Sequence, residues 1–164
     1  MPQLAYLSLG SNLDSKLGDR EHALRDAISR LETVGRVVAV SSSYETEPVE
    51  FAGQAWFLNC ALALETDFTP GQLMEVLLDL ERQMGRQRTQ KKGPRTIDMD
   101  ILLFGDAVVD SPEITVPHPA MHRRRFVLEP LVEIAPQAWH PVLNKTAREL
   151  LAQLPPGQAV RKFS

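Results

Sequence analysis

The sequence predicts an α+β fold: a ferredoxin-like βαββαβ core with helices packed on one sheet, followed by a C-terminal extension of helices and loops. Two observations support this fold class. Hydrophobic residues alternate in four segments, as in strands, and recur at helical spacing in two others. These segments follow one another in the order strand, helix, strand, strand, helix, strand. That order places both helices on one face of a single sheet.

The four expected strands are short segments rich in aliphatic residues and bounded by turn-forming ones. They span residues 3–9, 37–44, 57–66 and 96–104. The third strand has the clearest pattern, because every second residue from Leu58 to Leu64 is leucine or cysteine. Since side chains alternate across a strand, these residues would share one buried face.

Two helices are expected in the core, at residues 18–31 and 70–84, where apolar residues recur every three or four positions. The ends of the second helix are clearly marked. Thr69 can cap its first turn, Pro70 suits the first helical position because its missing N–H is not needed there, and Gly85 suits the residue after the last turn.

Beyond the last core strand the chain becomes rich in proline and irregular. A short helical region is expected around residues 121–134. The Thr-Ala-Arg-Glu pattern of residues 146–149 is a capping box that would open a last short helix. No linker separates the two parts. We therefore expect one domain over residues 1–164, made of a core at about 1–105 and a packed extension at 106–164.

The composition is that of an ordinary globular domain, with 164 residues, 43% of them hydrophobic and 24% charged. Its net charge of −3 argues against a nucleic-acid partner, which favours a basic excess. The single cysteine, Cys60, excludes a disulfide framework and a cysteine-rich zinc site, and its apolar surroundings predict a core thiol. No segment resembles a signal peptide or a membrane span, so we expect a cytoplasmic protein without a membrane partner. We also expect a monomer.

An acidic pair, Asp98 and Asp100, stands in the fourth expected strand among aliphatic residues. Alternation places both carboxylates on one face, with Cα atoms about 7 Å apart. Two such charges repel each other, and a divalent cation removes that penalty. Oxygen ligands suit Mg²⁺, which takes one or two carboxylates and completes its shell with water and phosphate oxygens. The alternative is an exposed sheet face where the aspartates only add solubility.

A run of cationic residues precedes the acidic pair, between glycines that indicate a turn. Its members are Arg86, Arg88, Lys91, Lys92 and Arg95. Alone, such a run would be a solvated loop. Next to a metal-binding carboxylate pair it favours a polyphosphate site, because arginine and lysine neutralise the charge that the metal leaves.

Further along, His118 lies between two prolines and could donate to phosphate or merely form a rigid turn. A second cationic cluster, Arg123 to Arg125, could serve the same anion or be surface charge. The sequence contains neither a Walker loop nor the glycine-rich loop of protein kinases. Any phosphoryl chemistry must therefore use another scaffold.

Five motifs, in order, resemble one family: 6-hydroxymethyl-7,8-dihydropterin pyrophosphokinase of folate biosynthesis. They are Gly10-Ser11-Asn12-Leu13, Tyr44-Glu45-Thr46-Glu47-Pro48, Phe57-Leu58-Asn59, the Gly-Pro-Arg-Thr-Ile-Asp-Met-Asp-Ile-Leu stretch of residues 93–102, and Val116-Pro117-His118. The resemblance runs from Tyr6 to about Pro136. It implies an ATP-dependent diphosphotransferase: the pterin hydroxymethyl oxygen attacks the β-phosphorus of ATP, the diphosphate moves as a unit, and AMP leaves.

The resemblance also implies roles for individual residues. Asp98 and Asp100 would hold two Mg²⁺ ions and, with Arg86, Arg88 and Arg95, form the catalytic set. The ATP site would comprise Glu81, Arg86, Arg88, Arg95, Ile101, Thr115 and His118. The pterin site would comprise Thr46, Val49, Phe57, Asn59, Asp98, Arg124 and Phe126. The two aromatic rings would enclose the flat pterin, and the asparagine would pair with its amide-like edge. Without the resemblance, both phenylalanines would be interpreted as core residues.

This chain departs from the family pattern in places. Lys91 and Lys92 stand in a shortened basic loop where some members carry Arg-Trp, so the loop keeps its positive charge without that aromatic residue. Pro119 replaces a frequent tyrosine, and Glu113 replaces a cationic residue that some members carry. The roles of Arg123 and Arg125 are left open. None of these departures changes the two aspartates.

The sequence leaves two rival functions to consider. A metal-dependent nucleotidyltransferase shares a Gly-Ser and an Asp-x-Asp element, but there the two lie close in sequence, whereas here most of the core separates them. A non-catalytic ferredoxin-like RNA-binding module would need a basic surface and aromatic strand motifs. The acidic balance and the absence of those motifs argue against it.

Overall fold

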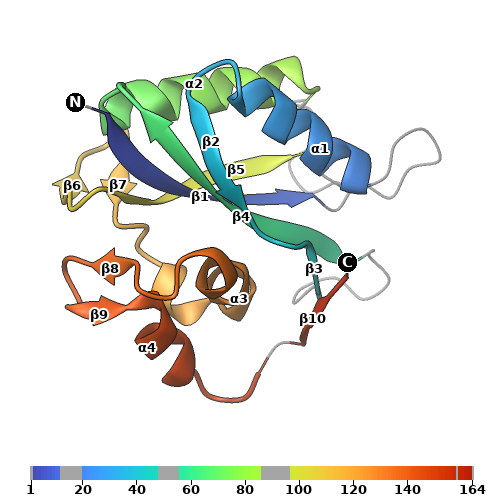
Figure 1. The fold of residues 1–164 in the computed structure, drawn as a ribbon, viewed down its shortest axis with the longest axis vertical. Helices are drawn as coiled ribbons and strands as arrows, with labels where there is room; N and C mark the ends of the chain where they lie inside the picture. Colours follow the sequence, from blue (N-terminus) through green and yellow to red (C-terminus); the bar gives the residue numbers. More distant parts are fainter. Residues whose placement is uncertain (1, 12–19, 48–55, 86–96, 158, 164) are drawn as a thin grey trace.

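A six-stranded antiparallel sheet forms the centre of the protein in a computed structural model that describes residues 2–11, 20–47, 56–85, 97–157 and 159–163 (Figure 1). The strands are β1 (Gln3–Ser11), β2 (Arg36–Val40), β3 (Tyr44–Thr46), β4 (Phe57–Thr66), β5 (Asp98–Phe104) and β10 (Val160–Lys162). Their order is β10-β3-β4-β1-β5, and β2 also pairs with β4. The long strand β4 therefore has β1 along one edge and β2 and β3 along the other.

Helices cover both faces of this sheet (Figure 1). On one face lie α1 (Arg20–Leu31) and α2 (Pro70–Gln83), and on the other lie α3 (Arg125–Ile134) and α4 (Ala147–Ala152). The first two belong to the core and occur in the predicted order among the strands. The α+β architecture expected from the sequence is confirmed, and the extension supplies the layer on the second face.

Each face has its own buried cluster, because alternate residues of the same strands point to opposite sides. Leucines of β1 and β4 and aliphatic residues of β5 pack against α1 and α2. On the opposite face a smaller cluster joins Leu102 and Leu103 of β5 to α3 and α4. As predicted, Leu58, Cys60, Leu62 and Leu64 share the first face. Burial raises the pKa of the Cys60 thiol to about 12, as expected of a packed core residue.

The helix ends agree with the sequence signals. Thr69 accepts from the N–H of Gln72 and donates its own N–H to the Gln72 side chain, which forms the capping box at the start of α2. Gly85 follows this helix with a φ of 90°, which favours glycine. Thr146 and Glu149 form the same reciprocal cap at the start of α4. These local patterns fixed both starts because each satisfies backbone donors that no helical partner can reach.

Two strand expectations need correction. The strand expected over residues 37–44 is divided into β2 and β3, and Ser41 lies at the break. Its N–H donates to the Ala61 carbonyl at 2.9 Å, while its hydroxyl accepts from the Ala61 N–H at 2.8 Å. The side chain thus replaces a backbone acceptor there. Strand β10 was not expected at all, because its largely exposed Val-Arg-Lys sequence shows no alternation.

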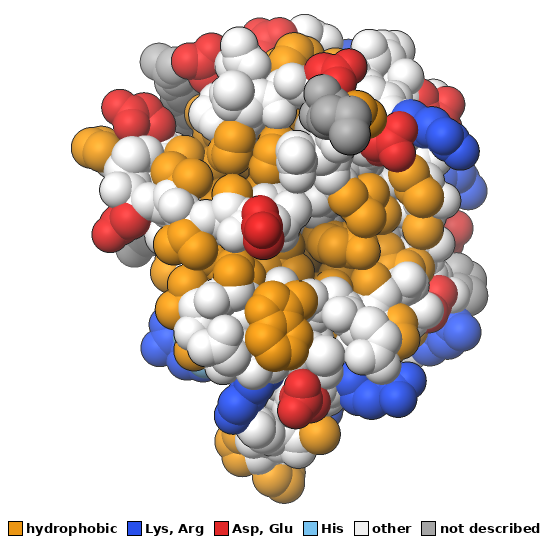
Figure 2. Space-filling model, turned by 60° about the vertical axis from the view of Figure 1, so that its left-hand side comes forward, with side chains coloured by type: hydrophobic (Ala, Val, Ile, Leu, Met, Phe, Trp, Pro, Cys, Tyr) orange, Lys and Arg blue, Asp and Glu red, His pale blue; other side chains and the backbone are white. Residues whose placement is uncertain are grey.

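The extension also contains short elements before α3 and between α3 and α4. They are β6 (Val109–Asp110), β7 (Thr115–Val116), the 3₁₀ helix η1 (Met121–Arg123), β8 (Trp139–His140) and β9 (Lys145–Thr146). Figure 2 turns the left-hand side of Figure 1 toward the viewer. In this space-filling view, hydrophobic side chains gather across the middle, with acidic side chains mostly above them and basic ones mostly below. Among the described residues, no helix has the length and apolar character to cross a membrane.

Candidate active site

The two aspartates lie on the sheet face that α1 and α2 do not cover. Asp98 and Asp100 are half-buried, whereas Met99 between them is buried in the core on the opposite face. Across the strand pair, Asp98 lies opposite Gly10 and Asp100 lies opposite Ser8. The predicted placement of both carboxylates on one face is therefore what β5 shows.

A buried glutamate holds the strand between the two aspartates. Glu81 of α2 is only 3% exposed, and its Oε2 accepts from the backbone N–H of Met99 at 2.7 Å. The contact fixes α2 to the segment of β5 that carries Asp98 and Asp100. Sequence reasoning placed Glu81 in the nucleotide site and missed this backbone contact, because nothing in the sequence indicates which strand N–H a helix carboxylate will meet.

His118 lies near the acidic pair on the segment that follows β7. Its N–H donates to the Leu102 carbonyl of β5 at 2.9 Å, and its Nδ1 accepts from the N–H of Ala120 at 3.1 Å. Burial lowers the pKa of His118, the Asp100 carboxylate raises it, and the Arg124 guanidinium lowers it, with a net downward shift. A neutral ring with an accepting Nδ1 carries its proton on Nε2, which is then a donor. The fold thus brings three predicted site residues within electrostatic reach of one another.

The polar part of the predicted pterin pocket is built across three strands. Asn59 of β4 is buried, and its Oδ1 accepts from the Thr46 hydroxyl of β3 at 2.9 Å. On its other side Asn59 lies opposite Gly10 of β1. A Cβ on Gly10 would come within 2.5 Å of Asn59 Nδ2, so a residue without a side chain is required there. Glycine on one strand therefore makes room for the amide of the next.

The aromatic part of the predicted pocket comes from both halves of the chain. Phe57 is half-buried and lies opposite Thr46, so alternation puts it on the same face as Asn59. Phe126 of α3 is half-buried and packs against the second cluster. The Arg124 guanidinium carbon lies 5.6 Å from the Phe126 ring centroid, within the range of a cation–π contact. Core packing accounts for part of the Phe126 environment, and its remaining exposure leaves a surface that a ligand could meet.

Other predicted residues are less close to this group. The Ile101 side chain is buried in the core on the α1 and α2 face, so it could meet a nucleotide only through its backbone. Thr115 is exposed on β7. Arg123 is exposed, whereas Arg125 pairs with Glu129 and donates to the Pro155 carbonyl, which gives it a structural role. The predicted residues Val49, Arg86, Arg88, Lys91, Lys92 and Arg95 lie outside the described residues.

A magnesium site would depend on the two aspartates. Within the part of the chain that the structure describes, no group of three or more histidine, cysteine, aspartate or glutamate side chains could hold a metal ion. Asp98 and Asp100 offer two half-buried carboxylates on one strand face. Two hard oxygen ligands match the preference of Mg²⁺, which completes its shell with water and phosphate oxygens.

Comparison with known proteins identifies the family of this chain. A model of the 7,8-dihydro-6-hydroxymethylpterin-pyrophosphokinase (HPPK) family matches residues 6–136. The chain is a member of the HPPK family. The match includes all five motifs on which the resemblance depended, and it ends within the extension.

Similar proteins agree with HPPK membership. The chain is 45% identical over 139 residues to the 2-amino-4-hydroxy-6-hydroxymethyldihydropteridine pyrophosphokinase of Bacillus subtilis, covering 84% of this chain and 81% of the relative. It is 44% identical over 154 residues to the enzyme of the same name from Methylorubrum extorquens, covering 93% and 94%. It is also 40% identical over 164 residues to Folic acid synthesis protein fol1 of Schizosaccharomyces pombe, but it spans only 22% of that longer protein.

Solved structures agree on the fold. A crystal structure of Plasmodium falciparum HPPK-DHPS superposes with a TM-score of 0.71 at 16% identity, covering 93% of this chain and 45% of that one. At that identity the likeness shows the fold alone. The expected HPPK family, the α+β fold class and an ATP-dependent diphosphotransferase of folate biosynthesis are confirmed together. Neither rival function fits a family match of this extent.

Proposed function

We propose that this chain transfers the diphosphate of ATP to 6-hydroxymethyl-7,8-dihydropterin at the site formed by β5, the start of β4 and the start of α3. The observation that carries this assignment is the shared sheet face. Asp98 and Asp100, which suit metal-bound phosphate, lie on the same face as Asn59 and Thr46, which suit a polar heterocycle. One surface thus offers adjoining places for donor and acceptor.

The acceptor side fits a flat ring with a polar edge. We propose that Phe57 and Phe126 enclose the pterin, where each stacked pair adds about 0.5–1.5 kcal/mol beyond area burial. Asn59 would pair with the edge of the ring, and its hydrogen bond from Thr46 fixes how the amide is turned. A buried amide without its ligand partner is costly, so this arrangement selects for the pterin edge. Val49 and Arg124 complete the proposed pocket.

The donor side fits a nucleotide triphosphate with two Mg²⁺ ions. Asp98 and Asp100 would hold these ions, which when bound would neutralise phosphate charge. His118 Nε2 is a described donor near Asp100. The predicted cations of the donor side are Arg86, Arg88 and Arg95. Glu81 keeps the strand of the aspartates in place, while contacts of Glu81, Ile101 and Thr115 with the nucleotide remain predictions.

In the proposed reaction the hydroxymethyl oxygen of the pterin forms a bond to the β-phosphorus of ATP. The bond from that phosphorus to the oxygen shared with the α-phosphate breaks, AMP leaves with the electron pair, and the hydroxyl proton is released. The protein contributes by orienting both substrates and by neutralising charge, since phosphoryl transfer needs little covalent help. No strong base is assigned.

We further propose that residues 1–105 and 106–164 act as one domain, because the site takes its aspartates from the first part and His118, Arg124 and Phe126 from the second. A monomer that works in the cytoplasm on these two small molecules, with neither nucleic acid nor membrane as a partner, completes the proposal.

The direct test is product analysis with purified protein, ATP and magnesium, with and without 6-hydroxymethyl-7,8-dihydropterin. We expect AMP and a pterin diphosphate in equal amounts, and only when the pterin is present. Release of pyrophosphate with a nucleotide attached to the acceptor would instead identify a nucleotidyltransferase. Absence of AMP at saturating substrates would overturn the proposal.

A further inference from the structure

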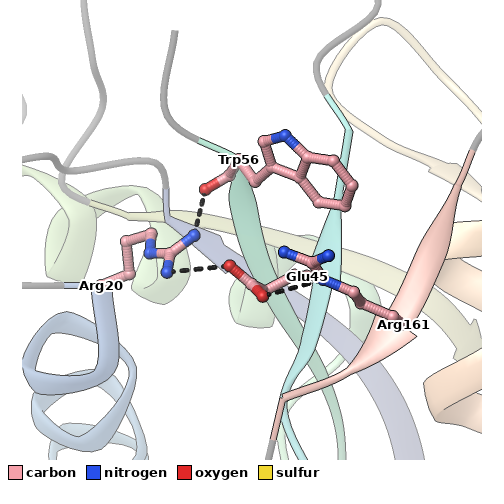
Figure 3. A network of polar contacts seen from close by, with 4 residues as sticks. All are labelled: Arg20, Glu45, Trp56 and Arg161. Atoms are coloured by element: carbon pink, nitrogen blue, oxygen red, sulfur yellow. Dashed lines mark hydrogen bonds and ion pairs between the residues drawn. The ribbon is translucent and has the colours of Figure 1, made fainter.

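Four side chains from four separate segments meet beside the start of β4 (Figure 3). They are Arg20 at the start of α1, Glu45 of β3, Trp56 just before β4, and Arg161 of β10. Glu45 lies opposite Leu58, which is buried on the α1 and α2 face. The group, which we call the Glu45 cluster, therefore lies on the opposite side of the sheet from Asn59 and Phe57.

Glu45 joins the two arginines of this cluster. Its Oε2 accepts from Arg20 Nη2 at 3.1 Å, and its Oε1 accepts from Arg161 Nε at 3.1 Å. The side chains of Arg20 and Glu45 are 19% and 15% exposed, so this half of the cluster is largely shielded from water. The Arg161 side chain is 65% exposed. An ion pair exposed to this extent contributes little to stability on its own.

Trp56 is held at two points by the same arginines. Its carbonyl accepts from Arg20 Nη1, and the Arg161 guanidinium carbon lies 4.3 Å from the centroid of its ring (Figure 3). A guanidinium this close to an indole face is a cation–π contact. Both the backbone and the ring of Trp56 are thereby fixed. Phe57 is the next residue in the chain.

Strand β10 brings Arg161 to this place from the far end of the chain. Arg161 lies opposite Glu45 in the pairing of β10 with β3, although the two are 116 residues apart in sequence. The N–H of Phe163 donates to the Ser43 carbonyl at 2.8 Å, and the Phe163 ring lies 5.6 Å from the Arg20 guanidinium carbon. The HPPK family model ends at residue 136, so β10 belongs to the part of the chain outside that match.

We infer that β10 is a positioning element of the acceptor pocket: Arg161, acting with Glu45 and Arg20, holds Trp56 and thereby sets the place of Phe57. The inference rests on the proposed function, since Phe57 is assigned to the pterin. Arg161 itself touches no substrate. It acts from the opposite face of the sheet and specifically on the acceptor, because the aspartates of the donor side lie on β5, which β4 and β1 separate from β3.

The kinetic test compares Arg161→Ala with Lys162→Ala. Lys162 is the next residue of β10, is exposed and carries the same charge, and alternation directs it to the other face. For Arg161→Ala we expect the KM for the pterin to rise about fivefold, because the variant loses a cation–π contact and an ion pair. The KM for ATP should be unchanged. Lys162→Ala should match the parent protein in both constants. Arg161→Lys should fall between, because lysine keeps the charge but loses the planar stack.

A spectroscopic test reports on the same contact without turnover. The chain has two tryptophans, so Trp139→Phe leaves Trp56 as the only one. In that background Arg161→Ala should change the emission of Trp56, because its ring loses the guanidinium and gains water, whereas Lys162→Ala should not. Thermal unfolding, followed by circular dichroism, establishes that each variant is folded at the assay temperature.

The outcomes separate this inference from the proposed function. A rise confined to the pterin KM, together with altered Trp56 emission, supports the positioning role. Equal rises in both KM values, or wild-type constants and emission in Arg161→Ala, overturn it while AMP formation by the parent protein stands. Failure of the parent protein to form AMP overturns the proposed function, and unchanged Trp56 emission in Arg161→Ala would then overturn the contact itself.

Discussion

The two faces of the central sheet are made from the same strands but differ in polarity where the site lies. Toward α1 and α2, strand β5 presents Met99 and Ile101, and β4 presents an unbroken series of apolar side chains. Toward α3, the intervening positions of β5 and β4 include Asp98, Asp100 and Asn59, and the apolar Leu102 and Ala61 follow them along the same strands. One strand therefore supplies core and site in alternate residues.

This difference separates the residues that stabilise the fold from those that serve the chemistry of the site. Apolar residues on the first face hold the sheet to α1 and α2, and part of the second face can then carry charge that would otherwise not be tolerated in a strand. Substitutions of core residues on the first face should lower stability and spare the chemistry, whereas substitutions of the polar site residues on the second face should do the reverse. The predictions below test that division, from the largest expected effect to the smallest.

Asp100→Ala should lower turnover about a thousandfold, or about 4 kcal/mol, because one of two proposed metal ligands is removed. Stability should change little, since Asp100 is only half-buried. Steady-state AMP formation at saturating magnesium measures the first effect and thermal unfolding the second. Asp106→Ala, at an exposed acid just beyond β5, is the control and should remain active. A variant with a tenth of the parental turnover would contradict the metal assignment.

Leu64→Ala should lower the free energy of unfolding by about 3 kcal/mol, because it leaves a cavity in the cluster under α1 and α2. Urea unfolding gives this value. Leu78→Ala, at a 43% exposed position of α2, should cost much less. The folded fraction of Leu64→Ala should keep parental turnover. If turnover falls as far as stability does, the two faces do not divide the work as proposed.

Gly10→Ala should raise the pterin KM about tenfold, or about 1.4 kcal/mol, because its methyl group would displace the Asn59 amide. The matched control is Gly71→Ala, since a Cβ at that α2 position meets nothing within 4 Å. Alanine favours a helix, so the control should be slightly stabilised. Separate titrations of pterin and ATP measure the effect. A larger loss of ATP binding than of pterin binding would place Asn59 in the wrong site.

The smallest effect is expected from pH and concerns the extension. Burial lowers the pKa of His140 below its usual 6.5, nearby His122 lowers it further, and its Nδ1 accepts from the Leu143 N–H at 3.0 Å. The unfolded chain therefore binds more protons, and the free energy of unfolding should fall as the pH drops below 6.5. His140→Asn should reduce this fall without abolishing it, because the pKa of His118 is lowered as well. Urea unfolding at pH 7.5 and 5.5 measures the difference, and equal pH dependence in both proteins would contradict it.

Local patterns let the sequence predict most of the core. The Thr69 cap and the alternation from Leu58 to Leu64 each depend on neighbours in the chain, so they could be interpreted without the fold. The placement of Asp98 and Asp100 on one face follows from the same alternation. The cationic run of residues 86–95 favoured phosphate as their ligand. Only the family resemblance named the pterin, because a carboxylate pair alone does not name a substrate.

Contacts between distant segments could not be predicted in this way. The carboxylate of Glu81 meets the Met99 N–H only after α2 has packed beside β5, and Gly10 faces Asn59 only after β1 has paired with β4. Strand β10 forms through backbone bonds to β3, which place no requirement on its side chains. Arg161 therefore carried no signal in the sequence, although it contacts two members of the Glu45 cluster.

The contact from Glu81 to Met99 also has a consequence for how copies of this protein behave toward one another. Strands β5 and β10 end the strand order of the sheet, and β2 is a further edge strand beside β4. Unpaired backbone groups on such strands can recruit a strand of a neighbouring molecule and start aggregation. The Glu81 carboxylate occupies a donor on β5, and Arg161 and Lys162 place positive charge along β10. The edges at β5 and β10 are thus protected against edge-to-edge association, and two of the side chains that protect them, Glu81 and Arg161, also hold neighbouring segments in place.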